Sequence, residues 1–411
     1  MNRARGTEAL RWLRHALKWL ALGMGVALLA GTASAWFLLA LAWATETREA
    51  HRWLLALLPV AGFAVGWVYL HVGQPVEAGN NLLIDEVHDP RQVVPVRMAP
   101  LIFLSTVVSH LFGASVGREG TAVQMGGALA DQFTHVFRLR ADDRRILLMA
   151  GISAGFASVF GTPLAGAVFG LEVLAIGRLR HEALWPCVVA AVVADQVCTL
   201  WGVHHGVYSA GLLPALSVGT LGAAIVVGLL CGLVGMAFAR STHGLSAFMK
   251  QRVAYAPLRP MLGGIVLAGV IWSTDAWRYA GLSLPGLAQA FTEPLPWWDF
   301  ALKGLFTSFS LGVGFKGGEV TPLFYMGATL GNALAPLLHQ PFPWLAALGF
   351  VALFAGAANT PLACILMAME VFGMGIGTHA ALACAMAYLT SGHAGIYKAQ
   401  RVEGSKYRWR R

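Results

Sequence analysis

Long apolar runs separated by short polar segments dominate this chain. Of its 411 residues, 57% are hydrophobic and only 12% are charged, which is about half the charged fraction of ordinary soluble domains. A soluble core cannot absorb that much apolar sequence, so the chain is predicted to be an all-α polytopic membrane protein. The runs cover residues 19–43, 53–72, 97–115, 146–176, 183–203, 211–239, 260–273, 299–315, 343–372 and 376–390.

The uneven lengths of these runs limit the kind of bundle that they can form. Several runs are too long for one crossing, and others are shorter than the ~20 residues that a clean span requires. Tilted, paired and broken helices explain this pattern better than a bundle of equal spans.

Basic residues gather in the terminal tails and in short loops. Lys and Arg number 29 against 20 Asp and Glu, a net charge of +9. This placement suits an anionic membrane leaflet rather than nucleic acid, and it predicts two cytoplasmic termini and an even number of crossings of the cell's inner membrane. The short basic tails contain Arg3, Arg5, Arg11, Arg14 and Lys18 at one end, and Lys398, Arg401, Lys406, Arg408, Arg410 and Arg411 at the other.

The chain lacks a polar block long enough for a soluble regulatory domain. The run 19–43 exceeds the roughly 7–15 residues of a signal-peptide core, so it is expected to remain as the first helix. Residues 1–411 are therefore predicted to form a single transmembrane domain. No cofactor or metal is expected, because the His204-His205 pair has no acidic or cysteine partner at ligand spacing.

An internal repeat divides the chain into two structural halves, about 20–200 and 215–397. Residues 162–173 read TPLAGAVFGLEV and residues 360–371 read TPLACILMAMEV, 198 positions apart. Upstream of these, Glu119-Gly-Thr121 precedes Gly127-Ala128 as Glu319-Val-Thr321 precedes Gly327-Ala328. Repeats of this kind build many transporters. Similarity alone leaves open whether the halves are inverted or parallel.

Each half contains a Gly-rich break followed by an apolar run. The breaks lie in GASVGREGTAVQMGGALA (113–130) and GVGFKGGEVTPLFYMGATLG (312–331). Glycines here let the backbone leave helical geometry, so each break presents a new helix N-terminus inside the membrane, with unpaired N–H groups. Two such ends that meet at mid-depth would form a site for a small anion.

Glu119 and Glu319 stand at these two ends. A carboxylate in a first turn often only caps the helix, but an ionisable residue at membrane depth is a functional hypothesis by default. A carboxylate can occupy an anion site as a competing ion, and once protonated it can withdraw and admit the free ion. This exchange would couple anion movement to proton movement. Arg118 and Lys316 are expected to pair with nearby carboxylates or carbonyls rather than to bind the ion.

Two further features allow other interpretations. Gly151-Ile-Ser153-Ala-Gly155 matches the pattern around a nucleophilic serine, which would make the chain an intramembrane serine protease with His379 or His393 as the base. That pattern needs a strand before it, however, and here it lies in a helical run where it also forms a small-residue packing face. Glu172 and Glu370 are paired by the repeat, and a structural role at helix ends explains them at least as well as ion handling.

The motifs taken together resemble those of the CLC family of chloride channels and proton-coupled anion antiporters. GREG at 117–120 looks like the gating-glutamate motif, TPLAGAVFGLE like the helix that follows it, and GIYK at 395–398 like the segment with the anion-binding tyrosine, Tyr397. The resemblance implies a CLC-type fold of two inverted repeats with broken, tilted helices. It also implies a homodimer with one pore per subunit, as do small-residue faces such as Gly166/Gly170.

Departures from the chloride-handling members resemble the fluoride-exporting branch. Those members carry a serine where this chain has Asn80, a proline where Thr121 stands, a phenylalanine at Val320, and a second, proton-relaying glutamate at Val173. Fluoride is small and strongly hydrated, so its site needs good hydrogen-bond donors. The predicted anion-binding residues are Asn80, Gly120, Thr121, Val320, Thr321 and Tyr397, and the predicted gating and proton-transfer residues are Glu119 and Glu319.

The sequence thus predicts a secondary transporter, not an enzyme, that exports fluoride in exchange for protons. A chloride channel or chloride/proton antiporter of the same family is the nearest alternative. The protease is a remote one. The expected partners are fluoride, protons, the lipid bilayer and a second copy of the chain, with no nucleic acid.

Overall fold

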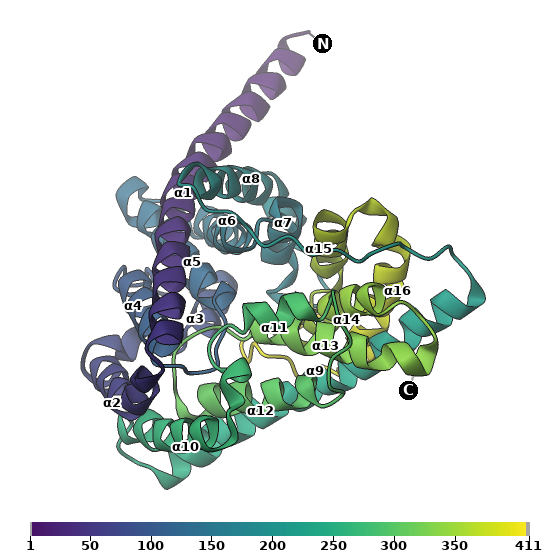
Figure 1. The fold of residues 1–411 in the computed structure, drawn as a ribbon. Coiled ribbons are helices and arrows are strands. Elements are labelled where there is room, and N and C mark those ends of the chain that lie inside the picture. Colours follow the sequence, from purple (N-terminus) through teal and green to yellow (C-terminus); the bar gives the residue numbers. More distant parts are fainter. Residues whose placement is uncertain (1, 408–411) are drawn as a thin grey trace.

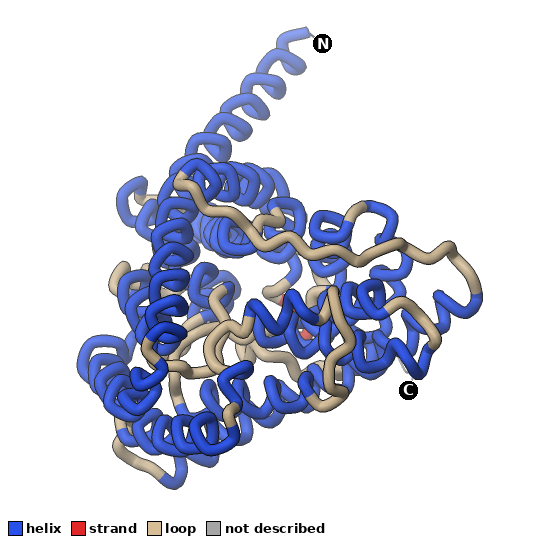
Figure 2. Tube along the Cα trace, viewed as in Figure 1, coloured by secondary structure: helices blue, strands red, loops and turns tan. Residues whose placement is uncertain are grey.

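The computed structural model describes residues 2–407, with side chains from residue 12 onward. Helices make up most of the described chain (Figures 1 and 2). Parts of the predicted basic tails fall outside this range: Arg408, Arg410 and Arg411, and the side chains of Arg3, Arg5 and Arg11.

The described part of the first half contains eight α-helices and one short strand. They are α1 (Asn2–Ala50), α2 (Leu58–Val68), α3 (Asn80–His88), α4 (Met98–Leu111), α5 (Glu119–Phe137), α6 (Ala141–Phe160), α7 (Pro163–Glu172), β1 (Ala175–Ile176) and α8 (Leu184–Leu200). Short 3-10 or π turns lie at η1 (Arg52–Leu57), η2 (Tyr69–Gly73), η3 (Gln74–Val76) and η4 (His181–Ala183). A long connection, residues 201–217, then crosses the molecule to the second half (Figure 2).

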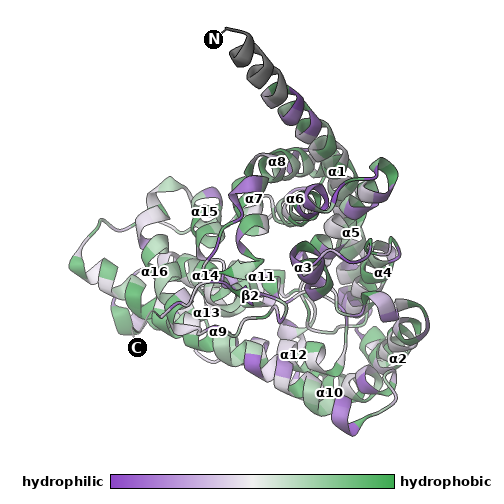
Figure 3. Cartoon of the chain, turned by 180° about the vertical axis from the view of Figure 1, so that it is seen from behind, coloured by the Kyte–Doolittle hydropathy of each residue, from purple (hydrophilic) through white to green (hydrophobic). Residues whose placement is uncertain are grey.

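As far as the structure describes it, the second half is also built mainly of α-helices, with one short strand. Its elements are α9 (Val218–Arg252), α10 (Leu258–Thr274), η5 (Ala276–Tyr279), α11 (Leu284–Gln289), α12 (Asp299–Val313), α13 (Val320–Leu338), α14 (Phe342–Ala358), α15 (Pro361–Phe372), η6 (Met374–Ile376), α16 (Gly377–Thr390) and β2 (Arg401–Val402). β2 pairs in parallel with β1, so the end of the described chain returns to the first half. Hydrophobic residues cover most of the helices, whereas α3 is largely hydrophilic (Figure 3).

The predicted broken helices are present. The run 146–176 divides into α6 and α7, where Gly161 has φ +78° and Pro163 begins the new helix. The run 343–372 divides in the same way, with Asn359 at φ +58° and Pro361 as the first residue of α15. Within the described residues, four helical stretches are long and apolar enough to cross a membrane, and the shorter apolar helices have 10–17 residues.

Reciprocal contacts relate the two halves by an approximate two-fold symmetry. Gly117 and Gly318 form an antiparallel bridge in which each N–H donates to the other residue's carbonyl. The carboxylate of Glu172 accepts from the N–H groups of Leu362 and Ala363 at the start of α15. Glu370 likewise accepts from Leu164 and Ala165 at the start of α7. The structural interpretation of these two glutamates is therefore correct.

Stacked aromatic rings join the halves in the core. Phe160 of α6 packs on Phe324 of α13 with ring centroids 4.9 Å apart, and Phe324 stacks in turn on Phe350 of α14 at 4.2 Å. Phe156 of α6 stacks on Phe169 of α7 and on Phe354 of α14. This contact holds the broken helices of one half against those of the other, which keeps the two breaks in register.

Candidate functional site

The N-termini of α5 and α13 meet at the Gly117–Gly318 bridge. Because α5 begins at Glu119 and α13 at Val320, the first turns of the two helices face each other across this bridge. The first N–H groups of a helix have no partner within it and carry the positive end of its dipole. The bridge thus concentrates hydrogen-bond donors from both halves at one point.

Glu119 places its carboxylate on the donors of the opposite half. Its side chain is fully buried. Oε2 accepts the backbone N–H of Thr321 at 2.9 Å, and the Thr321 hydroxyl donates to Oε1 at 2.8 Å and to Oε2 at 2.6 Å. The Arg118 guanidinium lies beside the same carboxylate, with Nε 3.4 Å from Oε1, as expected of a structural partner. The Glu119 carboxylate therefore takes up the hydrogen-bond donors that Thr321 offers in the first turn of α13.

Thr121 and Thr321 are repeat-related but have different surroundings. The Thr121 hydroxyl pairs with that of Thr106 at 2.8 Å, and its N–H donates to the carbonyl of Arg118. The structure thus does not bring the Thr121 hydroxyl onto Glu119, and its role in anion binding stays a prediction. Val320 begins α13 with its side chain buried, so any contribution from it comes from the backbone.

Asn80 adds a donor from a third helix N-terminus. It is the first residue of α3, directly after Gly79, whose φ of +60° and ψ of −127° favour glycine. A Cβ on Gly120 would lie only 3.1 Å from Asn80 Nδ2 and from the Cα of Gly318, so this glycine permits the close approach. The Asn80 Oδ1 atom, an acceptor, is buried without a partner among the described residues. The donor that an anion needs is Nδ2, and this atom lies on the Gly120 side of the group.

Tyr397 completes the group and is held there by backbone contacts. It is 5% exposed. The preceding N–H, of Ile396, donates to the carbonyl of Ala357, and the N–H of Ala399 donates to Asn81 Oδ1 at 2.9 Å. The bond from Ala399 ties the tyrosine segment to α3, so Asn81 positions Tyr397 beside Asn80. Sequence reasoning missed Asn81, because only its neighbour matched a family position.

A cavity of about 280 Å³ leads to this group. Asn80, Glu319 and Tyr397 line it, whereas Glu119 does not. Glu319 is half-buried, and its Oε2 lies 3.7 Å from where a Cβ on Gly120 would stand. Glu319 thus lies at the inner end of the cavity, between the open volume and the N-terminus of α5.

Lysines give the cavity a positive wall. Lys250, Lys316 and Lys398 line it, with Glu77 and Glu319 as opposing charges, so basic groups are in excess by one. The ammonium of Lys316 lies 4.0 Å from the ring centroid of Tyr69, so the prediction that it pairs with a carboxylate or carbonyl is wrong. Clefts lined by charge of one sign raise the local concentration of the opposite ion. This cavity therefore favours the approach of anions.

Lys303 fixes the loop that precedes Glu119, although no sequence pattern pointed to it. Its side chain is fully buried, and Nζ donates to the carbonyls of Tyr279 and Gly281 and to the hydroxyls of Ser115 and Ser283, at 2.8–3.1 Å. Because Ser115 lies just before the Gly117–Gly318 bridge, this lysine joins the bridge to the loop after η5.

The features that suggested an enzyme or a metal site have structural explanations. Ser153 lies inside α6 and not on a turn after a strand, and its hydroxyl donates to the carbonyl of Ala167. Gly151 and Gly155 pack tightly against Gly126 and Ala122 of α5. Among the side chains described, no three His, Cys, Asp or Glu residues gather where they could hold a metal ion.

Comparisons with known proteins agree with this architecture. The voltage gated chloride channel family matches residues 61–392. A Pseudomonas syringae pv. tomato protein named chloride/fluoride channel protein is 61% identical, over 99% of this chain and 91% of its own length. The crystal structure of a CLC-type fluoride/proton antiporter superposes with a TM-score of 0.91 at 32% identity, covering 94% of this chain and 98% of the other.

A more distant structure shares the fold. A slow cyanobacterial chloride/proton antiporter superposes with a TM-score of 0.80 at 20% identity, over 92% of this chain and 96% of that one. The sequence match covers most of the chain, and the reciprocally related halves, the broken helices and the facing helix N-termini are all present. The chain therefore belongs to the voltage gated chloride channel family, the CLC family.

Proposed function

We propose that this protein exchanges fluoride for protons across the membrane, with Glu119 as the gate. The observation that carries the proposal is the Glu119 carboxylate, bound by the N–H and the hydroxyl of Thr321 at the start of α13. Those donors would bind a small anion equally well. The carboxylate and the free anion therefore compete for one site.

Protonation of Glu119 would couple the movement of protons to the movement of the anion. A protonated Glu119 loses its charge, so it competes more weakly for the helix N-terminus and releases its donors to the incoming anion. Glu319 faces the cavity and approaches the N-terminus of α5, which supports it as the group that passes protons between the cavity and Glu119. Val173 stands where chloride antiporters have a proton-relaying glutamate, so this route replaces the usual one.

Fluoride is the favoured ion because the site offers strong donors. The Asn80 amide, the Thr321 hydroxyl and the Tyr397 phenol, with the N–H groups at Gly120 and Val320, would replace the ion's hydration shell. The 61% identical relative carries both chloride and fluoride in its name, and the structure at 32% identity is a fluoride/proton antiporter. Both relatives support fluoride as a substrate.

Ion-selective measurement in proteoliposomes tests this proposal. Liposomes that contain the full chain are loaded with fluoride or chloride and diluted into buffer without either ion, while electrodes follow the anion and the pH. Fluoride efflux with opposing proton movement is expected, and chloride efflux is expected to be far slower. Equal efflux of the two ions would favour the chloride alternative and reject the fluoride proposal.

We also propose a homodimer with one pathway per subunit, each chain forming one transmembrane domain with both termini in the cytoplasm. The basic tails support this orientation in the inner membrane through the positive-inside rule. Mass measurement in lipid nanodiscs tests the dimer, and a monomer there would reject it. Labelling of single cysteines introduced into the tails tests the orientation. A fluorophosphonate probe should leave Ser153 unlabelled.

A further inference from the structure

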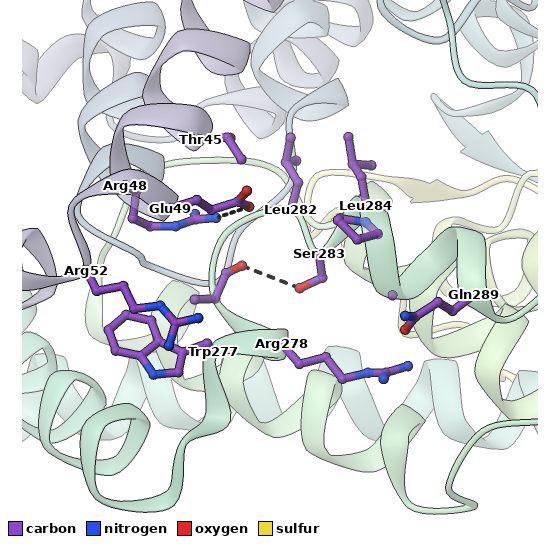
Figure 4. A pocket seen from close by; sticks show the side chains of 13 residues that line it. Thr45, Arg48, Glu49, Arg52, Trp277, Arg278, Leu282, Ser283, Leu284 and Gln289 are labelled. Carbon is purple, nitrogen blue, oxygen red and sulfur yellow. Dashed lines mark hydrogen bonds and ion pairs between the residues drawn. The ribbon is translucent and has the colours of Figure 1, made fainter.

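A second, larger cavity shares no lining residue with the cavity at Glu319. It has a volume of about 480 Å³ and lies between the C-terminal end of α1, the residues of η5 and α11 (Figure 4). At this end, α1 passes from the apolar run 19–43 into the polar segment 45–52. A helix that changes character in this way is leaving the hydrocarbon layer, so the cavity lies at the level of the membrane surface.

Three arginines line this cavity against one glutamate, so the lining carries a net charge of +2. Figure 4 shows Arg48, Arg52 and Arg278 approaching from different elements. Asp299 is not part of the lining: it lies behind the wall, with its Oδ2 2.9 Å from Nη2 of Arg278. The open volume therefore faces an excess of guanidinium groups.

The arginines are positioned by other contacts and retain unused donors. Arg48 is buried, donates one N–H to the carbonyl of His110 at 3.2 Å and pairs with Glu49 at 3.4 Å. Arg278 donates from Nε to the Tyr325 hydroxyl at 2.9 Å. Because each guanidinium has five N–H groups, both retain donors beyond these bonds.

Arg52 is the least constrained of the three. Among the residues that the structure describes, it is engaged by the ring of Trp277, whose centroid lies 5.1 Å from the guanidinium carbon. This stacking fixes the plane of the guanidinium without using its N–H groups. Arg52 is thus oriented and free to donate to a ligand.

The size and chemistry of the cavity identify the class of ligand. Its volume lies within the ~300–1,000 Å³ of small-molecule sites, far above the ~30 Å³ that a single water-sized ion needs. Planar guanidinium groups match the oxygens of phosphate. Trp53 and Trp272 lie nearby in the sequence and are 56% and 57% exposed, as expected of tryptophans at the membrane–water interface.

We propose that this cavity binds the phosphate group of an anionic phospholipid from the surrounding leaflet. Arg52 donates hydrogen bonds to the phosphate oxygens, and Arg48 and Arg278 supply positive charge from the walls of the cavity. Free inorganic phosphate offers the same chemistry without acyl chains, so the test separates the two sources.

Ligand binding to the full chain in non-ionic detergent tests the proposal. The probes are short-chain phosphatidylglycerol, short-chain phosphatidylcholine and inorganic phosphate, and the readouts are native mass spectra and the melting temperature. Phosphatidylglycerol is expected to bind and to raise the melting temperature. Arg52→Gln should weaken that binding roughly tenfold, the effect of losing a charged hydrogen bond. Arg97→Gln, a change of another exposed arginine that lines neither cavity, should have no effect.

Each outcome bears on the proposal. Binding of inorganic phosphate with the same dependence on Arg52 would reassign the ligand to free phosphate and reject the lipid. Equal binding of phosphatidylcholine would reject the requirement for net negative charge. If Arg52→Gln leaves the binding of phosphatidylglycerol unchanged, the proposed site is wrong. The proposed site is also wrong if none of the probes binds. None of these readouts involves ion transport, so they stand apart from the proposed exchange of fluoride for protons.

Discussion

Replacement of Glu119 by Gln tests the gate most directly, because the structure defines what the change removes. The carboxylate accepts one N–H and one hydroxyl from Thr321. A glutamine can keep this geometry, with its amide oxygen on the N–H and its amide nitrogen donating to the hydroxyl oxygen. The variant therefore keeps size and contacts but loses the charge and the exchangeable proton.

The expected change in fluoride affinity follows from the loss of the negative charge on residue 119. Hydrogen bonds to a charged group contribute about 1.5–3 kcal/mol, against about 0.5–1.5 kcal/mol for neutral pairs. The substituted amide should thus compete for Thr321 more weakly by about 1–2 kcal/mol, which corresponds to roughly 5- to 30-fold tighter apparent fluoride binding. Proton movement coupled to fluoride should be abolished, because the amide does not titrate.

The assay follows proton uptake driven by a fluoride gradient in proteoliposomes, together with equilibrium fluoride binding in detergent. Glu77→Gln is the matched control, since Glu77 lines the cavity but does not contact Thr321. The control should transport like the wild type. If Glu119→Gln still moves protons at the wild-type rate, the carboxylate is not the coupling group and the mechanism is wrong.

Four further outcomes are expected. Thr321→Val should weaken fluoride binding by roughly 1–3 kcal/mol, since it removes one buried donor, and an unchanged binding isotherm would contradict this. Glu319→Gln should slow proton transport in liposomes markedly and change the fluoride affinity in detergent less. If Glu319 only caps the helix, the substitution would instead cost only ~1 kcal/mol of folding stability. Lys303→Met should lower the melting temperature, because each carbonyl left unpaired costs roughly 1–3 kcal/mol. Burial raises the pKa of Glu403, but the hydrogen bond from Arg178 and the positive charges of Arg180 and Arg178 together outweigh burial, so the net pKa is lowered. The stability that this pair contributes is therefore present above the ordinary pKa of ~4.3 and lost as pH falls, so Glu403→Gln should lower the melting temperature at pH ~7 and much less at pH ~3.

Much of the architecture was predictable from the sequence because the membrane imposes strict rules on it. Apolar run lengths require helices, and glycine or Thr-Pro breaks within the runs mark where helices restart. The repeated islands around Glu119 and Glu319 indicated two halves whose helix ends form an anion site. The family-specific positions, Asn80 and Tyr397, pointed to the remaining walls of that site.

Only the tertiary structure decided how these pieces meet. Sequence similarity does not show how the halves pack, so their reciprocal contact became visible only in the Gly117–Gly318 bridge. The two repeat-related threonines look alike in the sequence, yet Thr321 binds Glu119 and Thr121 binds Thr106. Lys303 gave no signal, because its partners are backbone carbonyls and hydroxyls from distant segments. Local patterns specify helices and their ends, whereas the partner of a buried polar group depends on which distant segments packing brings within hydrogen-bond distance.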